Sequence, residues 1–467
     1  MSASDPNNLS LAELQEALAG EGTVQNFLDR EGIRFHKVAV TDIDGVMRGK
    51  YMCRDKFLSA VKSGFGFCDV VLGWDSNDEL YDNARVSGWH TGYRDAPVQL
   101  DLGSARTLPM EPATGLWLGS FAGGYADACP RSLLSRLAAR ARALGFEAQG
   151  SAEYEFFIFD ETPESVRAKG YRDLKPFTPG RFGYSMIRAG VHVELYQEIL
   201  DTFAAMGIEI EGLHTETGPG VIEAALRYGP IEAAADNATI FKTYMKILAQ
   251  RRGLMATFMA KWSADYPGQS GHIHVSLLKD GENAFYDPAA PSSMSETMRH
   301  FVAGQVALLP ELLPMVCPTI NSYRRLVPGM WAPLAANWGV ENRTTSIRVI
   351  EGEHGQRTEF RIGPADANPY LALAAALGAG LYGIERKLAL PDPVEGNAYE
   401  LQAKGKAGVP LASSLGEATA AFRGSAAARE IFGDTFVDHF ATTREWEIRE
   451  SRRHVSDWEL GRYFEII

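Results

Sequence analysis

The sequence is poor in cysteine, and its four cysteines lie far apart, at Cys53, Cys68, Cys129 and Cys317. None of them forms a CxxC pair, which argues against a zinc finger or a disulfide scaffold and favours a reducing compartment. The first ten residues are polar and lack the apolar stretch of a secretory signal. Apolar runs long enough to span a bilayer are also missing. These absences predict a cytoplasmic protein that does not enter a membrane.

Basic residues are also scarce relative to acidic ones, with 46 Lys and Arg against 59 Asp and Glu and a net charge of −13. Nucleic-acid binding needs a basic surface, so we expect no nucleic-acid partner. An anionic substrate stays compatible, because an arginine cluster or metal ions can hold it locally. With 467 residues, 45% of them hydrophobic, the chain can bury a large core. At about 150 residues per domain it has room for two or three domains.

Two common nucleotide and metal motifs, GxxxxGK[ST] and HExxH, do not occur. A GxGxxG pattern does occur over Gly378–Gly383, but it follows an Ala- and Leu-rich helical pattern instead of a strand. The dinucleotide-binding context is therefore absent. We interpret these glycines as sites of close helix packing.

Hydrophobic periodicity gives a coarse map of the elements. Strands and helices do not alternate regularly, so the sequence favours an α+β fold over a doubly wound sheet. A disordered tail is expected at 1–10, short helices at 11–28 and a hairpin turning at Asp44-Gly45 over 35–51. Longer helices are expected at 132–144, 231–252, 369–387 and 436–467, and a polar loop at 161–183.

The most informative pattern is a set of short predicted strands that are apolar on one face and carry reactive side chains on the other. Residues two apart on a strand share a face. The side chains grouped in this way are Glu153 with Glu155, His272 with His274 and Ser276, and Arg357 with Glu359 and Arg361, while Glu223 opens a further strand behind Glu216.

For any single strand, the simpler interpretation is a solvated sheet face with cross-strand ion pairs. Several such strands weaken that interpretation, because neighbouring like charges repel unless cations neutralise them. Carboxylates with an imidazole suit Mg²⁺ or Mn²⁺, and arginines bind carboxylate or phosphate oxygens in pairs. Metal ions and arginines on one sheet surface are what phosphoryl transfer requires.

A series of motifs from about residue 35 to the C-terminus makes the chain resemble the glutamine synthetase family. Each motif alone is weak evidence, but their order along the chain is specific. They are Glu153-Tyr-Glu-Phe156, His214-Thr-Glu216 followed by Glu223, Gly271-His-Ile-His274, Asn321 to Gly329, Glu341-Asn-Arg343, Arg357-Thr-Glu-Phe-Arg361 and Asn368-Pro-Tyr370.

The resemblance implies an N-terminal tail and helix over residues 1–30, a small β-grasp domain over 31–115, and a large catalytic domain with a curved antiparallel sheet over 116–467. It implies a homo-oligomer, a dodecamer of two hexameric rings, with active sites between neighbouring subunits. Each site would hold ATP, L-glutamate and Mg²⁺ or Mn²⁺. The implied reaction transfers the ATP γ-phosphoryl group to the glutamate side chain, and an amine then attacks the resulting γ-glutamyl phosphate.

The resemblance also assigns roles to residues at matching positions. Metal ions would be bound by Glu155, Glu216 and Glu223 at one site and by Glu153, His272 and Glu359 at the other. Arg325, Arg361 and Gly268 would bind glutamate, and Asp69, Arg343 and Glu216 would be catalytic. The nucleotide would contact Glu211, Tyr228, His274, Ser276, Arg348 and Arg357, although Tyr228 is equally compatible with a core tyrosine.

The amine end of the site matches the family only in part. Asp69 aligns with the aspartate that deprotonates the amine, acting in a neighbouring subunit's site; Asp95 matches a second ammonium-binding aspartate, and Tyr184 a bordering tyrosine. The ammonia-using enzymes carry a glutamate in the loop Pro328-Gly-Met-Trp-Ala-Pro333, where this chain has Trp331. The segment after Asp69 is also changed, to an apolar run ending at Leu72 and followed by Trp74.

Loss of that glutamate weakens ammonium binding, whereas an indole packs against carbon or makes a cation–π contact. The pattern therefore favours an amine larger than ammonia and resembles the γ-glutamylpolyamine and γ-glutamylalkylamide synthetases. In the alternative interpretation of Trp331, it is a structural residue of the loop and another acid serves. Two other functions stay open at this point: an ammonia-using glutamine synthetase, and a catalytically inactive structural relative.

Overall fold

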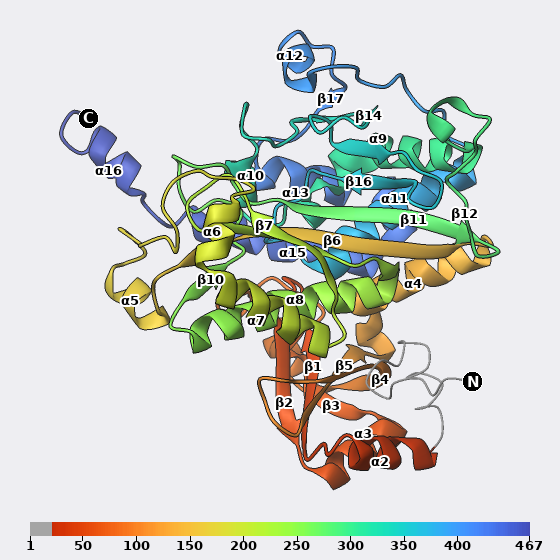
Figure 1. Cartoon of the computed structure of the whole chain (residues 1–467), viewed down its shortest axis with the longest axis vertical. Coiled ribbons are helices and arrows are strands. Elements are labelled where there is room, and N and C mark those ends of the chain that lie inside the picture. The colour runs from red at the N-terminus through yellow and green to blue at the C-terminus, as the bar shows by residue number, and fades with distance from the viewer. Residues whose placement is uncertain (1–20) are drawn as a thin grey trace.

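The computed structural model describes residues 21–467 and confirms the predicted α+β fold class (Figure 1). A small sheet domain lies below a much larger domain built around a second sheet (Figure 1). The predicted tail over residues 1–10, and the part of the helical pattern from Leu11 up to residue 20, lie outside the described residues. The rest of that pattern is α2 (Glu21–Arg30).

The small domain contains a five-stranded sheet with the order β2-β1-β5-β4-β3. The predicted hairpin is present, and the Asp42 carboxylate closes its turn by accepting hydrogen bonds from the backbone N–H groups of Asp44 and Val46. The elements are β1 (Phe35–Thr41), β2 (Met47–Met52), α3 (Arg54–Ser63), β3 (Phe65–Cys68), η1 (Asp69–Leu72), η2 (Trp89–Thr91), β4 (Asp95–Thr107) and β5 (Thr114–Phe121).

The large domain is organised by a ten-stranded sheet whose main path runs β14-β15-β16-β11-β6-β8-β7. Along this path only β14 and β15 pair in parallel. The strands are β6 (Glu147–Phe159), β7 (Ile210–Thr215), β8 (Val221–Leu226), β9 (Gly229–Pro230), β10 (Met255–Thr257), β11 (Gly271–Lys279), β12 (Glu282–Asn283), β14 (Trp338–Val340), β15 (Ile347–Ile350) and β16 (Arg357–Phe360); β13 (Ala335–Ala336) pairs separately with β17 (Val409–Pro410).

Helices α4, α8 and α11 pack against one face of this sheet and bury it. Helices α4, α8 and α11 start and end close to the predicted positions, and Pro130 occupies the first turn of α4 as expected. The single helical stretch predicted over 436–467 is wrong, because α15 ends at Ser451 and α16 begins at Asp457, and the long helix α9 was not predicted. The helices are η3 (Gly123–Ala128), α4 (Pro130–Ala143), α5 (Pro163–Ala168), α6 (Met186–Val191), α7 (Val193–Ala205), α8 (Ile231–Arg251), η4 (Pro291–Ser293), α9 (Glu296–Val316), α10 (Ser322–Arg325), α11 (Pro369–Arg386), α12 (Ala398–Ala403), α13 (Leu415–Gly424), α14 (Ala426–Phe432), α15 (Asp434–Ser451) and α16 (Asp457–Tyr463).

The glycines of the GxGxxG pattern lie inside α11 and are confirmed as sites of close helix packing. A Cβ atom on Gly383 would lie 2.1 Å from the His300 carbonyl oxygen of α9, and one on Gly380 would lie 2.1 Å from the Phe301 ring. On α9, Gly304 faces the same contact. Glycine therefore allows the backbones of α9 and α11 to approach each other directly.

The predicted loop over 161–183 is wrong in one detail, because it contains the short helix α5. Thr162 and Ser165 form a capping box at its start, each side chain bonding the other residue's backbone N–H. A six-residue segment is too short for hydrophobic periodicity to reveal a helix. Within residues 21–467, no helix combines the length and the apolar character needed to cross a bilayer.

Candidate active site

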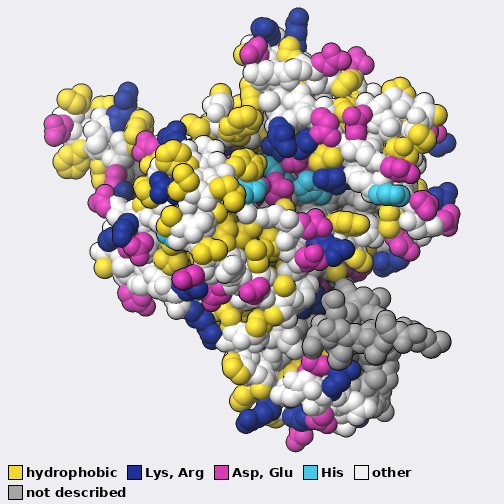
Figure 2. Space-filling model, in the orientation of Figure 1, with side chains coloured by type: hydrophobic (Ala, Val, Ile, Leu, Met, Phe, Trp, Pro, Cys, Tyr) yellow, Lys and Arg dark blue, Asp and Glu magenta, His cyan; other side chains and the backbone are white. Residues whose placement is uncertain are grey.

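A cavity of about 630 Å³ lies over the face of the large sheet that the helices leave uncovered. In Figure 2 it is the hollow where histidine, acidic and basic side chains gather. Alternation along the strands explains this chemistry, because Tyr154 and Phe156 of β6 are buried on the helix side while Glu153 and Glu155 point the other way. The cavity therefore collects the charged side chains of several strands.

The strand register brings these side chains side by side. Glu153 of β6 pairs with His272 of β11, and His274 of β11 pairs with Glu359 of β16. On the other side of β6, Glu155 pairs with Glu223 of β8. Residues that are distant in the sequence therefore form two neighbouring groups of ligand atoms.

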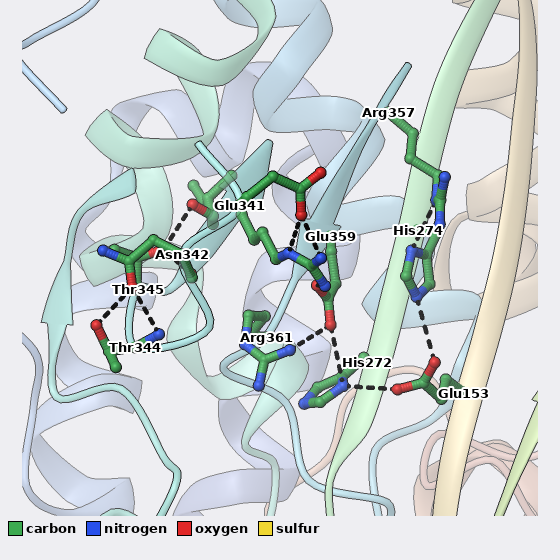
Figure 3. A network of polar contacts seen from close by, with 12 residues as sticks. Glu153, His272, His274, Glu341, Asn342, Thr344, Thr345, Arg357, Glu359 and Arg361 are labelled. Atoms are coloured by element: carbon green, nitrogen blue, oxygen red, sulfur yellow. Dashed lines mark hydrogen bonds and ion pairs between the residues drawn. The ribbon is translucent and has the colours of Figure 1, made fainter. Parts of the chain in front are cut away.

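The first group is the network drawn in Figure 3. His272 Nδ1 lies 3.1 Å from Glu153 Oε1 and 3.2 Å from Glu359 Oε1, so the predicted trio converges. Candidate ligand atoms of Glu153, Glu359 and His274 also lie within 4.8 Å of one another. Burial alone would raise the pKa of Glu359, but the charges of His272 and Arg361 outweigh it and lower that pKa to about 2.

In the second group, Glu216 and Glu223 converge with His214, whose candidate ligand atoms lie within 4.8 Å of theirs. His214 Nε2 is 3.0 Å from Glu223 Oε1. Burial would lower the pKa of His214, but hydrogen bonding and charge from Glu223 outweigh it and raise the pKa to about 8. Glu155 lines the same cavity, and burial, then the charge of Glu223, raises its pKa to about 7.

Both groups fit divalent cations such as Mg²⁺ or Mn²⁺. Carboxylate oxygens with an imidazole nitrogen form the donor set that these ions accept. The protein leaves this set incompletely neutralised, since Glu155 and Glu223 face each other and both have raised pKa values. His272 Nε2 is also buried without a hydrogen-bond partner among residues 21–467.

Arginines surround the carboxylates. Arg325 is only 2% exposed and donates from Nη1 to the Ile362 carbonyl oxygen at 2.9 Å. Gly268 leaves room for the Arg325 side chain, because a Cβ at position 268 would lie 2.7 Å from Arg325 Cγ. Arg361 donates a hydrogen bond from Nη1 to Glu359, and its buried Nε lacks a hydrogen-bond partner among the described residues.

Two further arginines lie on the β15 side of the cavity, among its lining residues. Arg348 bridges two carboxylates, with Nη1 at 3.1 Å from Glu359 Oε2 and Nε at 3.0 Å from Glu341 Oε2. Arg343 is exposed and makes no hydrogen bond or ion pair with the part of the chain that the structure describes. Its guanidinium is therefore available to an anion in the cavity.

A second, smaller cavity of about 250 Å³ adjoins the first and shares Glu153, His274 and Arg357 with it. The other predicted nucleotide residues, Glu211, Tyr228 and Ser276, also line this smaller cavity. Tyr228 is 64% exposed, so the alternative of a core tyrosine is wrong.

Aromatic side chains line another part of the large cavity. Trp331 is 60% exposed and Tyr184 is 70% exposed, and both have a left-handed backbone, with φ of 56° and 54°. The Tyr184 ring stacks on His214 with centroids 4.4 Å apart. Left-handed bulky residues are strained and concentrate at functional sites.

The predicted amine-site residues of the small domain lie outside both cavities. Asp69 is fully buried and accepts hydrogen bonds from the hydroxyls of Ser87 and Tyr125, at 3.0 and 3.1 Å. Leu72 is buried in the core of the small domain, and Trp74 stacks beneath Arg48. Asp95 is exposed at the start of β4.

Sequence reasoning missed His214 as a possible ligand, although it had a signal. His214 and Glu216 are two apart beside a strand, the same spacing that singled out Glu153 and Glu155. Other lining residues of the large cavity, including Phe157, Val221, Met330 and Ile350, are apolar and gave no chemical signal.

Comparison with known proteins agrees with the site. The family model "Glutamine synthetase, catalytic domain" matches residues 127–463. Type-1 glutamine synthetase 2 of Dictyostelium discoideum is 43% identical over 97% of this chain and 88% of its own. Glutamate–isopropylamine ligase of a Pseudomonas species is 37% identical over 95% of this chain and 98% of its own. Gamma-glutamylethanolamide synthetase of Streptomyces coelicolor is 36% identical over 92% of each chain.

Solved structures agree as well. GmaS without ligand has a TM-score of 0.81 and 25% identity, over 94% of this chain and 98% of its own. The GmaS–ADP complex has a TM-score of 0.82 at the same identity, over 94% of this chain and 99% of its own. Enzymes of this family use ATP and a divalent metal ion. The matched domain, the near full-length relatives and the arrangement of the site together show that this chain belongs to the glutamine synthetase family.

Proposed function

We propose that this ligase joins the γ-carboxylate of L-glutamate to an organic amine larger than ammonia, through a γ-glutamyl phosphate intermediate. A carboxylate does not react directly with an amine at neutral pH, because its oxygen is a poor leaving group. Phosphoryl transfer from ATP overcomes this difficulty. The amine then attacks the acyl carbon, and phosphate leaves.

The observation that carries the proposal is the exposed indole of Trp331 at the cavity, where ammonia-using enzymes carry a glutamate. An indole cannot supply the negative charge that a small ammonium ion requires, but it offers a flat surface to alkyl carbons. Met330 and Tyr184 line the same cavity and extend its apolar surface. Two relatives, named for isopropylamine and ethanolamide, make such an amine a natural candidate.

L-Glutamate would be held by Arg325 and Arg361, with Gly268 beside them. Guanidinium groups bind carboxylates by paired hydrogen bonds, and a buried one binds more strongly because water does not compete. Arg325 and Arg361 both line the large cavity and are nearly buried. Gly268 keeps the space open for the Arg325 side chain.

ATP would lie across the two adjoining cavities. Its base and ribose would occupy the smaller one beside Tyr228, Glu211 and Ser276, and its phosphates would point toward the shared residues His274 and Arg357. Divalent ions held by the two carboxylate groups would supply positive charge to the phosphates when bound. Arg343 and Arg348 would stabilise the negative charge of the transferred phosphoryl group.

The attacking amine must be deprotonated, and we assign this step to an acidic residue of a neighbouring subunit. Asp69 is the candidate from the resemblance, and Asp95, which matches a second ammonium-binding aspartate, is an exposed carboxylate of the same small domain. Because both lie outside the cavities of their own chain, the proposal includes a homo-oligomer, a dodecamer of two hexameric rings, in which sites are shared. On assembly, Asp69 would replace the hydrogen bonds that it accepts from Ser87 and Tyr125 with contacts in the neighbouring subunit's site.

An ammonia-using glutamine synthetase is the second candidate, favoured by the name of the Dictyostelium relative. Trp331 argues against it. The test is phosphate release by the purified protein with ATP, Mg²⁺ and L-glutamate. Ammonia, methylamine, ethanolamine, isopropylamine, putrescine, spermine and benzylamine would be added in turn. We expect turnover with an organic amine and little with ammonia. Turnover with ammonia alone would contradict the proposal, and no turnover with any amine would indicate an inactive relative.

A further inference from the structure

Two loops that contribute residues to the large cavity also contact each other. The first, residues 177–185, precedes α6 and places Tyr184 in the cavity lining. The second, residues 258–270, joins β10 to β11 and contributes Pro267 and Gly268. The contact between the loops is made by residues that do not line either active-site cavity.

Arg181 of the first loop makes this contact. Its Nη2 donates a hydrogen bond to the Asp265 carbonyl oxygen, and its guanidinium lies over the Tyr266 ring, 5.0 Å from the ring centre. The Tyr266 ring also stacks on Trp262, with centroids 5.8 Å apart. A planar guanidinium that bonds a carbonyl and stacks on a ring is held in one orientation. Arg181 therefore fastens the two loops to each other.

The loop that carries Arg181 is itself anchored to the large sheet. Thr215, the last residue of β7, accepts a hydrogen bond at its carbonyl oxygen from the Tyr184 N–H at 2.7 Å. Its hydroxyl donates to the Phe182 carbonyl oxygen at 2.9 Å. Thr215 is buried and directly precedes Glu216, a candidate metal ligand. The backbone beside Arg181 is therefore fixed relative to the active site.

The second loop is closed at its base, where the Gln269 N–H donates to the Ala260 carbonyl oxygen at 2.8 Å. Its tip, residues 263–266, has fewer restraints. Within the described part of the chain, Arg181 is the only residue outside this loop that makes a hydrogen bond or a ring contact with the tip. The position of the tip therefore depends on Arg181.

We propose that Arg181 is a positioning residue for substrate binding, because it holds the tip of residues 263–266 and thereby fixes Pro267 and Gly268 at the cavity. These two residues directly follow the tip, and a Cβ on Gly268 would lie 2.7 Å from Arg325 Cγ. Movement of the tip would therefore disturb the site assigned to L-glutamate. The inference rests on the proposed function for the identity of this acid.

Proteolysis of the ligand-free protein tests the restraint without any substrate. Endoproteinase Asp-N cleaves before aspartate, and mass spectrometry would follow the cut before Asp265 relative to the cut before exposed Asp280, in the β11–β12 turn. We expect Arg181→Ala to speed the cut before Asp265 by about tenfold, because a released loop opens more often. The matched control is Arg188→Ala, an exposed arginine that stacks on Phe182 of the same loop, 5.3 Å from its ring centre. An unchanged rate in Arg181→Ala would overturn the proposal.

Steady-state kinetics with the preferred amine tests the consequence for binding. If the tip is in place about a tenth of the time in Arg181→Ala, the KM for L-glutamate should rise about tenfold. The kcat and the KM for ATP should change by less than about twofold, whereas a general folding defect would lower kcat as well. Arg188→Ala should have wild-type constants. An unchanged KM for L-glutamate, or an equal rise for ATP, would overturn the proposal.

A double-mutant cycle separates the contact from other effects of the arginine. Tyr266→Ala removes the ring beneath the guanidinium and should also raise the KM for L-glutamate, and the combined variant should add little to Arg181→Ala. Fully multiplying effects would show that the two residues act independently and would contradict the proposal. A wild-type protein without turnover would refute the proposed function instead, and the proteolysis would still decide whether Arg181 restrains the loop.

Discussion

Glu155 on β6 and Glu223 on β8 lie directly opposite each other in the sheet, and each has a raised pKa. Two facing carboxylates destabilise the protein when no cation lies between them. The pair therefore predicts a stabilising divalent ion.

We expect Mg²⁺ to raise the melting temperature of the wild-type protein, equivalent to about 2.7 kcal/mol at about a hundred times the dissociation constant. Glu155→Gln should lose most of this increment, while its metal-free form should be no less stable, because one repelling charge is gone. Thermal unfolding with EDTA or Mg²⁺ measures both. Glu147→Gln, at the exposed start of the same strand, is the matched control; an unchanged Mg²⁺ effect in Glu155→Gln would refute the assignment.

Shared active sites predict complementation between two inactive variants. Asp69→Asn and Glu216→Gln subunits should each be inactive as homo-oligomers. In randomly mixed oligomers, about a quarter of the sites would combine an intact Asp69 with an intact Glu216 from a neighbour, restoring about a quarter of the activity.

Co-expression with two affinity tags provides the mixed oligomers, and phosphate release measures their activity. Mixing Glu155→Gln with Glu216→Gln is the control, because both residues line one cavity of the same chain and no site could be intact. Activity no higher than that of the separate variants would rule out sharing of Asp69.

The contact between α9 and α11 predicts a large effect from one methyl group. Gly383→Ala places Cβ 2.1 Å from the His300 carbonyl oxygen, so the two helices must separate. We expect a loss of about 1–3 kcal/mol of unfolding free energy in urea titrations. The control is Gly416→Ala on α13, where the atom nearest to the new Cβ is Ser414 Oγ at 3.9 Å, so this change should be neutral or stabilising. Equal stability of the two variants would contradict the close packing.

Buried His439 of α15 predicts part of the acid sensitivity. Neither of its nitrogens has a partner within residues 21–467, and burial, then the charge of Arg444, lowers its pKa from 6.5 to about 4. The unfolded chain thus binds the proton more readily, so this contribution is present above pH 6.5 and is lost as the pH falls toward 4.

We expect His439 to account for about 2 kcal/mol of stability lost between about pH 7 and about pH 5. The measurement is the difference between urea titrations of the wild type and His439→Leu at both pH values. Exposed His454→Leu should behave as wild type. A wild-type pH dependence retained in His439→Leu would show that other groups are responsible.

Trp331 predicts a change of acceptor on substitution. Trp331→Glu restores a negative charge beside the amine and removes the apolar surface. We expect the ratio of kcat/KM for ammonia to that for the preferred amine to rise by about tenfold or more, or about 1.4 kcal/mol. Trp331→Phe keeps an aromatic surface and should keep the organic amine. If both variants had the wild-type ratio, Trp331 would be only a structural residue of its loop.

Much of the site was accessible from sequence because strands place alternate residues on one face. Glu153, Glu155 and His272 could be grouped without coordinates for this reason. The register between the strands could not be predicted, because the pairing of β6 with both β8 and β11 depends on long-range contacts that periodicity does not report. Tyr228 shows the same limit, since its exposure follows from the end of β8 at Leu226.

The small domain was harder to interpret. The hairpin at Asp44-Gly45 followed from turn chemistry, because short polar residues close such turns. The burial of Asp69 and Leu72 depends on packing around η1, which a four-residue segment does not encode by itself. A cavity of about 450 Å³ between the turn 44–47, α8 and α15 likewise arises from elements that are far apart in the sequence.

A competition experiment measures which acceptor the enzyme prefers. The wild-type protein would receive ATP, Mg²⁺ and L-glutamate with ammonia and the best organic amine at equal concentrations, and mass spectrometry would quantify both products. We predict that the γ-glutamylamide of the organic amine exceeds glutamine. A product pool dominated by glutamine would show instead that the protein is an ammonia-using enzyme.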